Sequence, residues 1–182
     1  MRAVVMAGGL GTRLRPLTTA VPKPLLPVVG RPMIEHILRL LARHGITEVT
    51  VTVAHLATAV RGYLADGAEL GLTIDYATEH EPLGTAGGVR AAVAHSEEDV
   101  LVLSGDAVTD IDLGALMESH SRSGASFTMC LARRNDPREF GLAQVDEQGM
   151  VTRFLEKPAW GEVFCDTVST GIYVVSPSVL AA

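Results

Sequence analysis

Long apolar runs are absent from this chain of 182 residues. A membrane-spanning helix needs about 18 or more consecutive apolar residues, and no segment approaches that length. Met1-Arg2 leads directly into a strand-like segment and not into a basic and apolar leader, which argues against a secretory signal peptide. We therefore expect a cytoplasmic protein without a membrane partner.

Cysteine and positive charge are also scarce. The two cysteines, Cys130 and Cys165, lack the C-x-x-C spacing of zinc or redox motifs, so we expect packed free thiols. The six histidines show no metal-ligand spacing, and we assign them no role. The formal net charge is -6 and the pI is near 5.5. Because nucleic acids are anionic, this balance argues against a nucleic-acid partner.

Hydrophobic residues are plentiful and patterned. They make up 47% of the chain, enough for one domain with a core between covered layers. Short β-branched runs alternate with helical patterns, which is typical of repeated βαβ units. We predict an α/β, Rossmann-like fold with a mostly parallel sheet covered by helices on both faces. The expected strands are Ala3–Met6, Val49–Ala54, Leu72–Ala77, Val100–Ser104 and Ser126–Leu131, and the expected helices are Pro32–His44, Leu56–Ala65, Thr85–His95 and Leu113–Ser123.

The C-terminal third has a different pattern. It predicts an antiparallel hairpin and then one more strand, at Phe140–Val145, Val151–Leu155 and Gly171–Val175. Ser176-Pro177 is typical of a helix start, yet only five residues follow Pro177. We therefore expect the domain 1–182 to be incomplete at its C-terminus, with one part at 1–133 and the start of another at 134–182.

The most informative segment runs from Met6 to Thr18 and is followed by Pro22-Lys-Pro-Leu-Leu-Pro27. It begins where the first buried strand would end. It contains three glycines and three cations, which are Gly8, Gly9, Gly11, Arg13, Arg15 and Lys23. Glycines let backbone N–H groups approach a polyphosphate, and the cations offset its charge. The pattern therefore indicates a phosphate-handling loop.

Two common phosphate loops are excluded. A Walker loop needs Gly-Lys-Ser/Thr, whereas Gly11 is followed by Thr12 and Arg13. A dinucleotide-binding fingerprint needs a third glycine where this chain has Leu14, and it opens directly into a helix that the following prolines forbid. A kinase of the Walker type and a dinucleotide oxidoreductase are therefore both disfavoured.

The complete string G-G-x-G-T-R-L-x-P-L-T with P-K-P-L-L-P resembles the signature of the sugar-1-phosphate nucleotidyltransferases. The resemblance implies the nucleotide-diphospho-sugar transferase fold, with nucleotide binding in 1–133 and sugar-phosphate binding beginning in 134–182. It implies that Arg13 holds the triphosphate and that Lys23 bridges the phosphates of nucleotide and sugar, both as catalytic residues. The residues implied to wrap the nucleotide are Ala7, Gly8, Gly9, Gly11 and Thr12.

A second motif lies between Glu79 and Gly88. Its string E-P-L-G-T-A-G resembles a loop of mannose-1-phosphate guanylyltransferases, which implies that Gly84 and Thr85 lie against the base or ribose, with Glu81 as a further candidate. Taken alone, the string fits a proline-glycine turn before a helix equally well. It opens a predicted helix after the third strand, where ligands of parallel sheets bind.

A third motif, Ser104-Gly-Asp106, follows the predicted strand Val100–Ser104. It places a carboxylate at the carboxyl edge of the sheet. Nucleotidyl transfer needs Mg²⁺ there, and a hard cation prefers oxygen ligands. We therefore predict Asp106 as catalytic metal ligand, and we interpret Asp110 and Asp112 as cap or turn residues.

The remaining motifs lie in the C-terminal third. In Phe154-Leu-Glu-Lys-Pro158 the resemblance implies that Glu156 bonds sugar hydroxyls and that Lys157 holds the sugar phosphate. Further sugar-contacting positions by resemblance are Gly141, Thr170 and Gly171. Position 169 is commonly asparagine in this family, and the shorter Ser169 leaves that contact in question.

Five motifs in the family's order span residues 2 to 177. They most resemble the N-terminal domain of mannose-1-phosphate guanylyltransferase, which implies that GTP and mannose 1-phosphate react with Mg²⁺ to give GDP-mannose and pyrophosphate. A glucose-1-phosphate uridylyl- or thymidylyltransferase and a non-catalytic regulatory subunit that senses nucleotide sugars remain alternatives. A homo-oligomer or further C-terminal domains also remain open, and the family's second metal-binding aspartate has no counterpart before Ala182.

Overall fold

The structure is a computed structural model that describes residues 1–54, 56–79, 84–93 and 96–180. The chain divides into two compact units. The first unit is Met1–Thr128 together with Tyr173–Ala182, and the second is Met129–Ile172. The last segment of the chain thus returns to the first unit.

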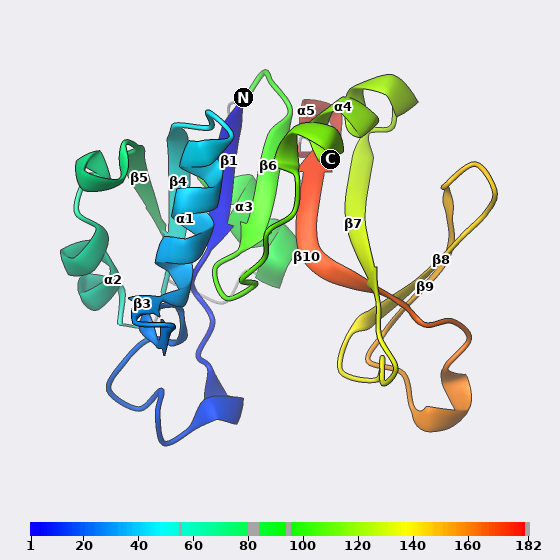
Figure 1. The fold of residues 1–182 in the computed structure, drawn as a ribbon, viewed down its shortest axis with the longest axis horizontal. Coiled ribbons are helices and arrows are strands. Elements are labelled where there is room, and N and C mark those ends of the chain that lie inside the picture. Colours follow the sequence, from blue (N-terminus) through cyan, green and yellow to red (C-terminus); the bar gives the residue numbers. More distant parts are fainter. Residues whose placement is uncertain (55, 80–83, 94–95, 181–182) are drawn as a thin grey trace. The chain divides into compact units, whose positions relative to one another are not determined.

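A mostly parallel sheet forms the centre of the first unit, as the alternating sequence pattern predicts (Figure 1). Strand β1 pairs in parallel with a strand on each side, Ala3 opposite Val49 and Arg2 opposite Val100. The order across the sheet is β5 (Thr73–Thr78), β4 (Glu48–Val53), β1 (Arg2–Met6), β6 (Val100–Ser104) and β10 (Thr167–Val175). Because β1, β4, β5 and β6 run in one direction, their carboxyl ends share one edge.

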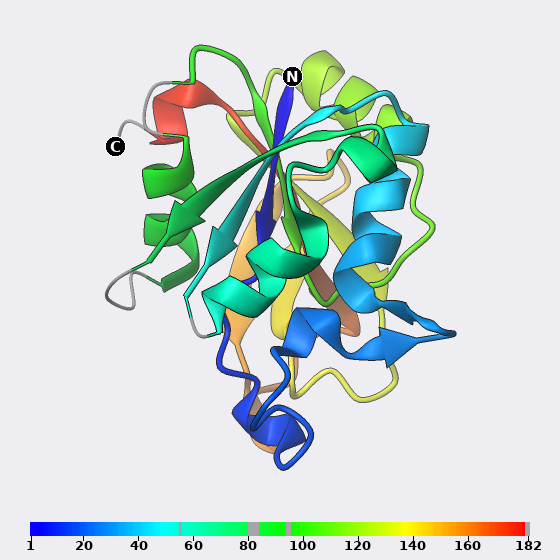
Figure 2. The same cartoon turned by 90° about the vertical axis from the view of Figure 1, so that its left-hand side faces the viewer.

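Helices cover both faces of this sheet, and α1 and α3 lie on opposite faces (Figures 1 and 2). On the α3 face, Val4 and Val102 of the sheet pack in one buried cluster with Val89 and Val93. Successive strand residues point to opposite faces, so continuous valine and leucine runs fill both layers. The helices are α1 (Met33–Arg43), α2 (Ala57–Leu64), α3 (Gly84–Ala92), α4 (Leu113–Ser123) and α5 (Pro177–Leu180).

Helix boundaries follow the predicted signals. Pro32 stands at the N-cap of α1, and Gly45 adopts a φ of 72° just beyond its end. Asp112 caps α4 by accepting a 3.0 Å hydrogen bond from the Ala115 amide, which confirms its structural interpretation. The predicted end of α3 at His95 falls outside the described residues.

Between β1 and α1 the prolines permit only short elements. These are η1 (Thr12–Leu14), η2 (Lys23–Leu25) and a small hairpin of β2 (Pro27–Val28) with β3 (Arg31–Pro32). A further 3-10 turn, η3 (Ala68–Leu70), precedes β5. The sequence predicted the absence of a regular helix after the glycine loop, whereas it did not predict the hairpin.

The second unit is built on the predicted antiparallel hairpin of β8 (Gly141–Val145) and β9 (Val151–Glu156). Its turn is closed by a 3.0 Å hydrogen bond from the Asp146 amide to the Met150 carbonyl. Strand β7 (Phe127–Arg133) runs into this unit, and η4 (Trp160–Glu162) precedes β10. Strand β10 begins at Thr167, earlier than predicted, because buried Val168 pairs with Leu142.

The described residues contain no helix long and apolar enough to cross a membrane. Cys130 and Cys165 are free thiols, in agreement with the sequence interpretation.

Candidate functional site

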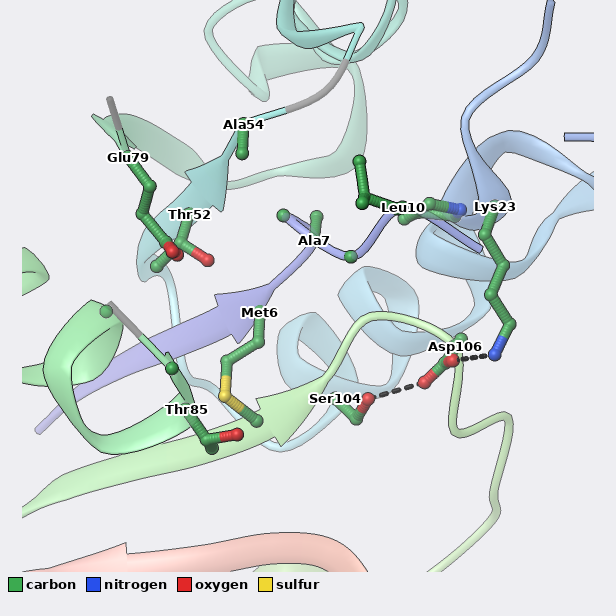
Figure 3. Close-up of a pocket in the computed structure, with 15 residues that line it drawn as sticks. Met6, Ala7, Leu10, Lys23, Thr52, Ala54, Glu79, Thr85, Ser104 and Asp106 are labelled. Carbon is green, nitrogen blue, oxygen red and sulfur yellow. Dashed lines mark hydrogen bonds and ion pairs between the residues drawn. The ribbon is translucent and has the colours of Figure 1, made fainter. Parts of the chain in front are cut away.

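A cavity of about 670 Å³ opens at the carboxyl edge of the first unit's sheet (Figure 3). Four strands end there, and the residues that follow them line the cavity. These include Ala7 to Leu10 after β1, Ala54 after β4, Glu79 after β5 and Asp106 after β6. The cavity therefore lies where open parallel sheets bind their ligands.

The glycine loop after β1 starts from a fixed backbone. The Ala7 amide donates a 3.0 Å hydrogen bond to the Thr52 carbonyl, and Ala7 is buried. A Cβ on Gly9 would meet no atom within 4 Å. The backbone at Gly9 is thus open on the side where a side chain would stand.

Gly11 folds the loop back toward Lys23. Its φ is 61°, and a Cβ there would lie 2.9 Å from Thr18 Cγ2 and 3.1 Å from Lys23 Cβ. The Thr18 hydroxyl, almost fully buried, donates a 2.8 Å hydrogen bond to the Gly11 carbonyl. Gly11 therefore serves the packing of the loop that positions Lys23.

Lys23 and Asp106 meet in the cavity from sequence positions far apart (Figure 3). Lys23 Nζ donates a hydrogen bond to Asp106 Oδ2 and forms an ion pair with it. The Ser104 hydroxyl donates to the other oxygen, Oδ1. Gly105 allows this turn because a Cβ there would lie 2.7 Å from the Met6 carbonyl oxygen. Two residues predicted to be catalytic are thus brought together.

The pKa of Asp106 lies below its ordinary value. Burial raises the pKa, but the hydrogen bonds from Lys23 and Ser104, with the charge of Lys23, outweigh burial. The carboxylate is therefore ionised at neutral pH.

The donors at Asp106 fit a hard divalent cation. An ionised carboxylate with the neighbouring Ser104 hydroxyl offers oxygen ligands of the kind Mg²⁺ prefers, and Mg²⁺ commonly binds one or two carboxylates together with substrate phosphates. Among the described residues no group of three His, Cys, Asp or Glu side chains gathers. The protein part of such a site is therefore small, and phosphate oxygens would have to complete it.

Glu79 lies toward the other end of the cavity from Lys23 and Asp106, beside Thr52 (Figure 3). Its backbone is fixed by a 2.9 Å hydrogen bond from its amide to the Val53 carbonyl. A Cβ on Gly88 would lie 2.6 Å from Glu79 Oε1. Within the described part of the chain, no hydrogen-bond donor reaches this carboxylate.

Glu79 and Ser104 line the cavity, and the sequence reasoning did not select either as a candidate site residue. Each stands at the end of a predicted strand, as Asp106 does, and that shared position is the signal that could have identified them. Gly84 and Thr85, predicted from the second motif, do line the cavity at the start of α3. Glu81 lies outside the described residues.

The residues predicted for the glycine loop differ in whether they line the cavity. Thr12 and Arg13 belong to η1 and have exposed side chains, and neither is among the described residues that line the cavity. Lys23, by contrast, lines it directly. The role of Arg13 thus remains a prediction.

The predicted sugar-phosphate residues all belong to the second unit. Gly141 is opposite Glu156 in the hairpin, and a Cβ on Gly141 would lie 2.7 Å from Glu156 Oε2. Lys157 follows with a φ of 45°, and its amide donates a 3.0 Å hydrogen bond to the Phe140 carbonyl. These contacts bring Gly141, Glu156 and Lys157 together at one end of the hairpin.

Thr170 and Gly171 lie on β10 in the same unit. The Thr170 hydroxyl donates a 2.9 Å hydrogen bond to the Cys130 carbonyl, so it ties β10 to β7. Gly171 has a φ of 77°, which favours glycine at this point of the strand. Each residue therefore has a structural role in the second unit.

Comparison with known proteins gives the family of this chain. The nucleotidyl transferase family matches residues 2–182. A mannose-1-phosphate guanylyltransferase of Mycobacterium tuberculosis is 39% identical over 98% of this chain and 49% of its own length. A UTP–glucose-1-phosphate uridylyltransferase of Synechocystis is 34% identical over 99% of this chain and 50% of its own.

Solved structures agree in fold. A Bacillus anthracis protein assigned as a glucose-1-phosphate thymidylyltransferase superimposes with a TM-score of 0.91 at 27% identity, covering 100% of this chain and 73% of its own. The chain spans about half the length of the curated relatives it matches. From its glycine loop to β10, this chain belongs to the nucleotidyl transferase family.

Proposed function

We propose that this chain carries the nucleotidyl-transfer site of an enzyme that joins a nucleoside triphosphate to a hexose 1-phosphate. A phosphate oxygen of the sugar phosphate attacks the α-phosphorus, the bond to the β-phosphate breaks, and pyrophosphate leaves. The observation that carries the proposal is the cavity at the carboxyl edge of the sheet, with the Lys23–Asp106 pair at one end and Glu79 toward the other. Such catalysis rests on positioning and charge neutralisation.

In this proposal the residues at the phosphate end neutralise charge. Arg13 holds the triphosphate and stabilises the departing pyrophosphate, and Lys23 bridges the phosphates of nucleotide and sugar. Asp106, supported by Ser104, would hold Mg²⁺, which supplies Lewis-acid polarisation of the α-phosphate when bound. The backbone of the glycine loop at Gly8 and Gly9, which lines the cavity, would lie beside the nucleotide.

The carboxylate of Glu79 supports guanine as the base. The Watson–Crick edge of guanine offers two adjacent N–H donors, which two carboxylate oxygens can accept together. Uracil and thymine offer one donor between two carbonyl oxygens, and adenine offers a donor beside an acceptor, so each would set an oxygen or nitrogen lone pair against Glu79. The relatives named as guanylyltransferases agree with this preference. The Synechocystis relative is named as a uridylyltransferase, so uracil is the alternative base.

The second unit would bind the sugar phosphate. Glu156 accepts hydrogen bonds from sugar hydroxyls and Lys157 binds the sugar phosphate, with Gly141, Thr170 and Gly171 shaping the surface. The relatives named for mannose 1-phosphate make mannose the proposed sugar. We place the reaction in the cytoplasm, which the two free thiols support.

Pyrophosphate release with Mg²⁺, for four nucleoside triphosphates against mannose and glucose 1-phosphates, tests the proposal. Release selective for GTP with mannose 1-phosphate is expected. Selectivity for UTP or dTTP with glucose 1-phosphate would replace the base and sugar while keeping the reaction. Nucleotide binding without release from any pair would contradict catalysis by this chain and favour a regulatory domain.

A further inference from the structure

The cavity carries little positive charge for a polyphosphate site. Among the described residues that line it, the charged side chains are Lys23, Asp106 and Glu79. One ammonium and two carboxylates leave the lining with an excess of negative charge. A nucleoside triphosphate adds several negative charges, so the lining as it stands opposes its approach.

The ammonium of this lining already has an internal partner. Lys23 pairs with Asp106 Oδ2, and the two side chains are 31% and 28% exposed. Ser104 holds the other carboxylate oxygen. The oxygen that a metal ion would use most readily is therefore the one that Lys23 covers.

We propose that Lys23 occupies the cation position of Asp106 in the nucleotide-free protein and keeps its affinity for divalent metal low until nucleotide phosphates draw Lys23 away. This inference rests on the proposed function, because it assigns a control to the same site. Ser104 is a positioning residue in this proposal. Its hydrogen bond holds Asp106 Oδ1 in place, and Asp106 Oδ2 can then pair with either Lys23 or a metal ion.

The Lys23 side chain can turn from Asp106 to a phosphate while its own backbone stays in place. The Lys23 carbonyl accepts a 3.1 Å hydrogen bond from the Leu26 amide, and the prolines on either side, Pro22 and Pro24, are buried. The lysine stem is flexible and ends in a point charge that can turn from a carboxylate to a phosphate. Rotation of the side chain alone therefore suffices.

The exchange couples two binding events. A phosphate that takes Lys23 uncovers Asp106, which raises the affinity for the divalent cation. By linkage, the bound cation raises the affinity for the phosphate by the same factor. The pair thus favours the nucleotide and metal together over either alone.

Manganese binding to the nucleotide-free chain tests the inference. Free Mn²⁺ is measured by electron paramagnetic resonance during titration of the wild type and of Lys23→Gln. Removing the competing ammonium from this partly exposed pair is expected to tighten Mn²⁺ binding about fivefold. Equal or weaker binding by Lys23→Gln would overturn the inference.

Three further variants make the result specific. Arg122→Gln removes the same charge on α4, where Arg122 is 72% exposed and 3.9 Å from Glu118, and is expected to leave Mn²⁺ affinity unchanged. Lys23→Arg keeps the charge and adds a forked donor to the carboxylate, so no tightening is expected. Asp106→Ala is expected to abolish the binding. An equal gain in Arg122→Gln, or binding that survives in Asp106→Ala, would overturn the assignment.

The outcome is separable from that of the proposed function because no nucleotide or sugar enters the titration. Turnover by the wild type without tighter Mn²⁺ binding in Lys23→Gln would reject the control by Lys23 alone. Tighter binding without turnover from any substrate pair would keep the control and reject the reaction.

Discussion

The two units of the chain hold their candidate residues in different ways. In the first unit, four parallel strands end together, three of them (β1, β4 and β6) largely buried on both faces, and Lys23, Asp106 and Glu79 line one cavity. In the second, Glu156 ends the largely exposed hairpin strand β9, Lys157 follows it, and Gly141 leaves room for the Glu156 side chain. The first arrangement depends on side-chain charge within a rigid frame, whereas the second depends on backbone shape.

The largest expected effect is on catalysis, and it should differ between substitutions of the two lysines of the chain. Lys23→Ala is expected to lower kcat for pyrophosphate release by about 10²- to 10³-fold, because it removes a positive charge at the reacting phosphates. Lys157→Ala is expected chiefly to raise KM for the hexose 1-phosphate. Steady-state kinetics with each substrate varied will show the difference. Equal loss of nucleotide affinity in both variants would remove the proposed division between the units.

A smaller effect is expected from Gly141→Ala in the second unit. The added Cβ would lie 2.7 Å from Glu156 Oε2 and against the Phe154 ring. We expect the free energy of unfolding to fall by about 1–3 kcal/mol and KM for the sugar phosphate to rise. Calorimetry should show unchanged nucleotide affinity.

Gly161→Ala is the matched control for that change. A Cβ on Gly161 meets nothing within 4 Å, so its stability and kinetics should match the wild type. If the stability and kinetics of Gly141→Ala also match those of the wild type, the second unit does not need a glycine at position 141 to hold Glu156.

A still smaller effect is expected from Gly88→Ala in the first unit. Its Cβ would lie 2.6 Å from Glu79 Oε1, the end of a flexible side chain that can move aside. Stability should therefore change little, while the preference for GTP over UTP should fall severalfold. Nucleotide titrations measure this, with Gly62→Ala as control because its Cβ meets no atom. An undiminished preference would count against Glu79 as the base-selecting residue.

The smallest effect concerns pH. Asp106 has a pKa lowered from its ordinary value of 3.8, so its pairing with Lys23 stabilises the fold fully above that value. The contribution is lost as pH falls through the lowered pKa. We expect the difference in unfolding free energy between wild type and Asp106→Asn to shrink below about pH 4. Chemical denaturation across acidic pH measures it, and a constant difference would contradict the pairing.

Much of the first unit was predictable because its signals are local. The runs at β1 and β6 and the cap at Asp112 each follow from a few neighbouring residues. The placement of Lys23 on Asp106 was not predictable, because it depends on how Gly11 packs against Thr18. A contact between residues so distant in sequence has no periodicity to reveal it.

Glu79 was also not predictable from local sequence. Sequence reasoning drew on the string around Gly84 and passed over the residue at the end of β5. That end becomes a cavity wall only when β5 and β4 align in register, with Thr78 opposite Val53. Strand order therefore supplies what residue types alone do not.

Calorimetric titration of GTP and UTP with Mg²⁺ into the wild type and Glu79→Gln tests the central claim most directly. The carboxylate of Glu79 predicts that GTP binds the wild type at least about tenfold more tightly. The amide of Glu79→Gln accepts one hydrogen bond and donates another, so it should weaken GTP and favour UTP. Equal affinities in the wild type, or an unchanged preference in the variant, would contradict a guanine site in this cavity.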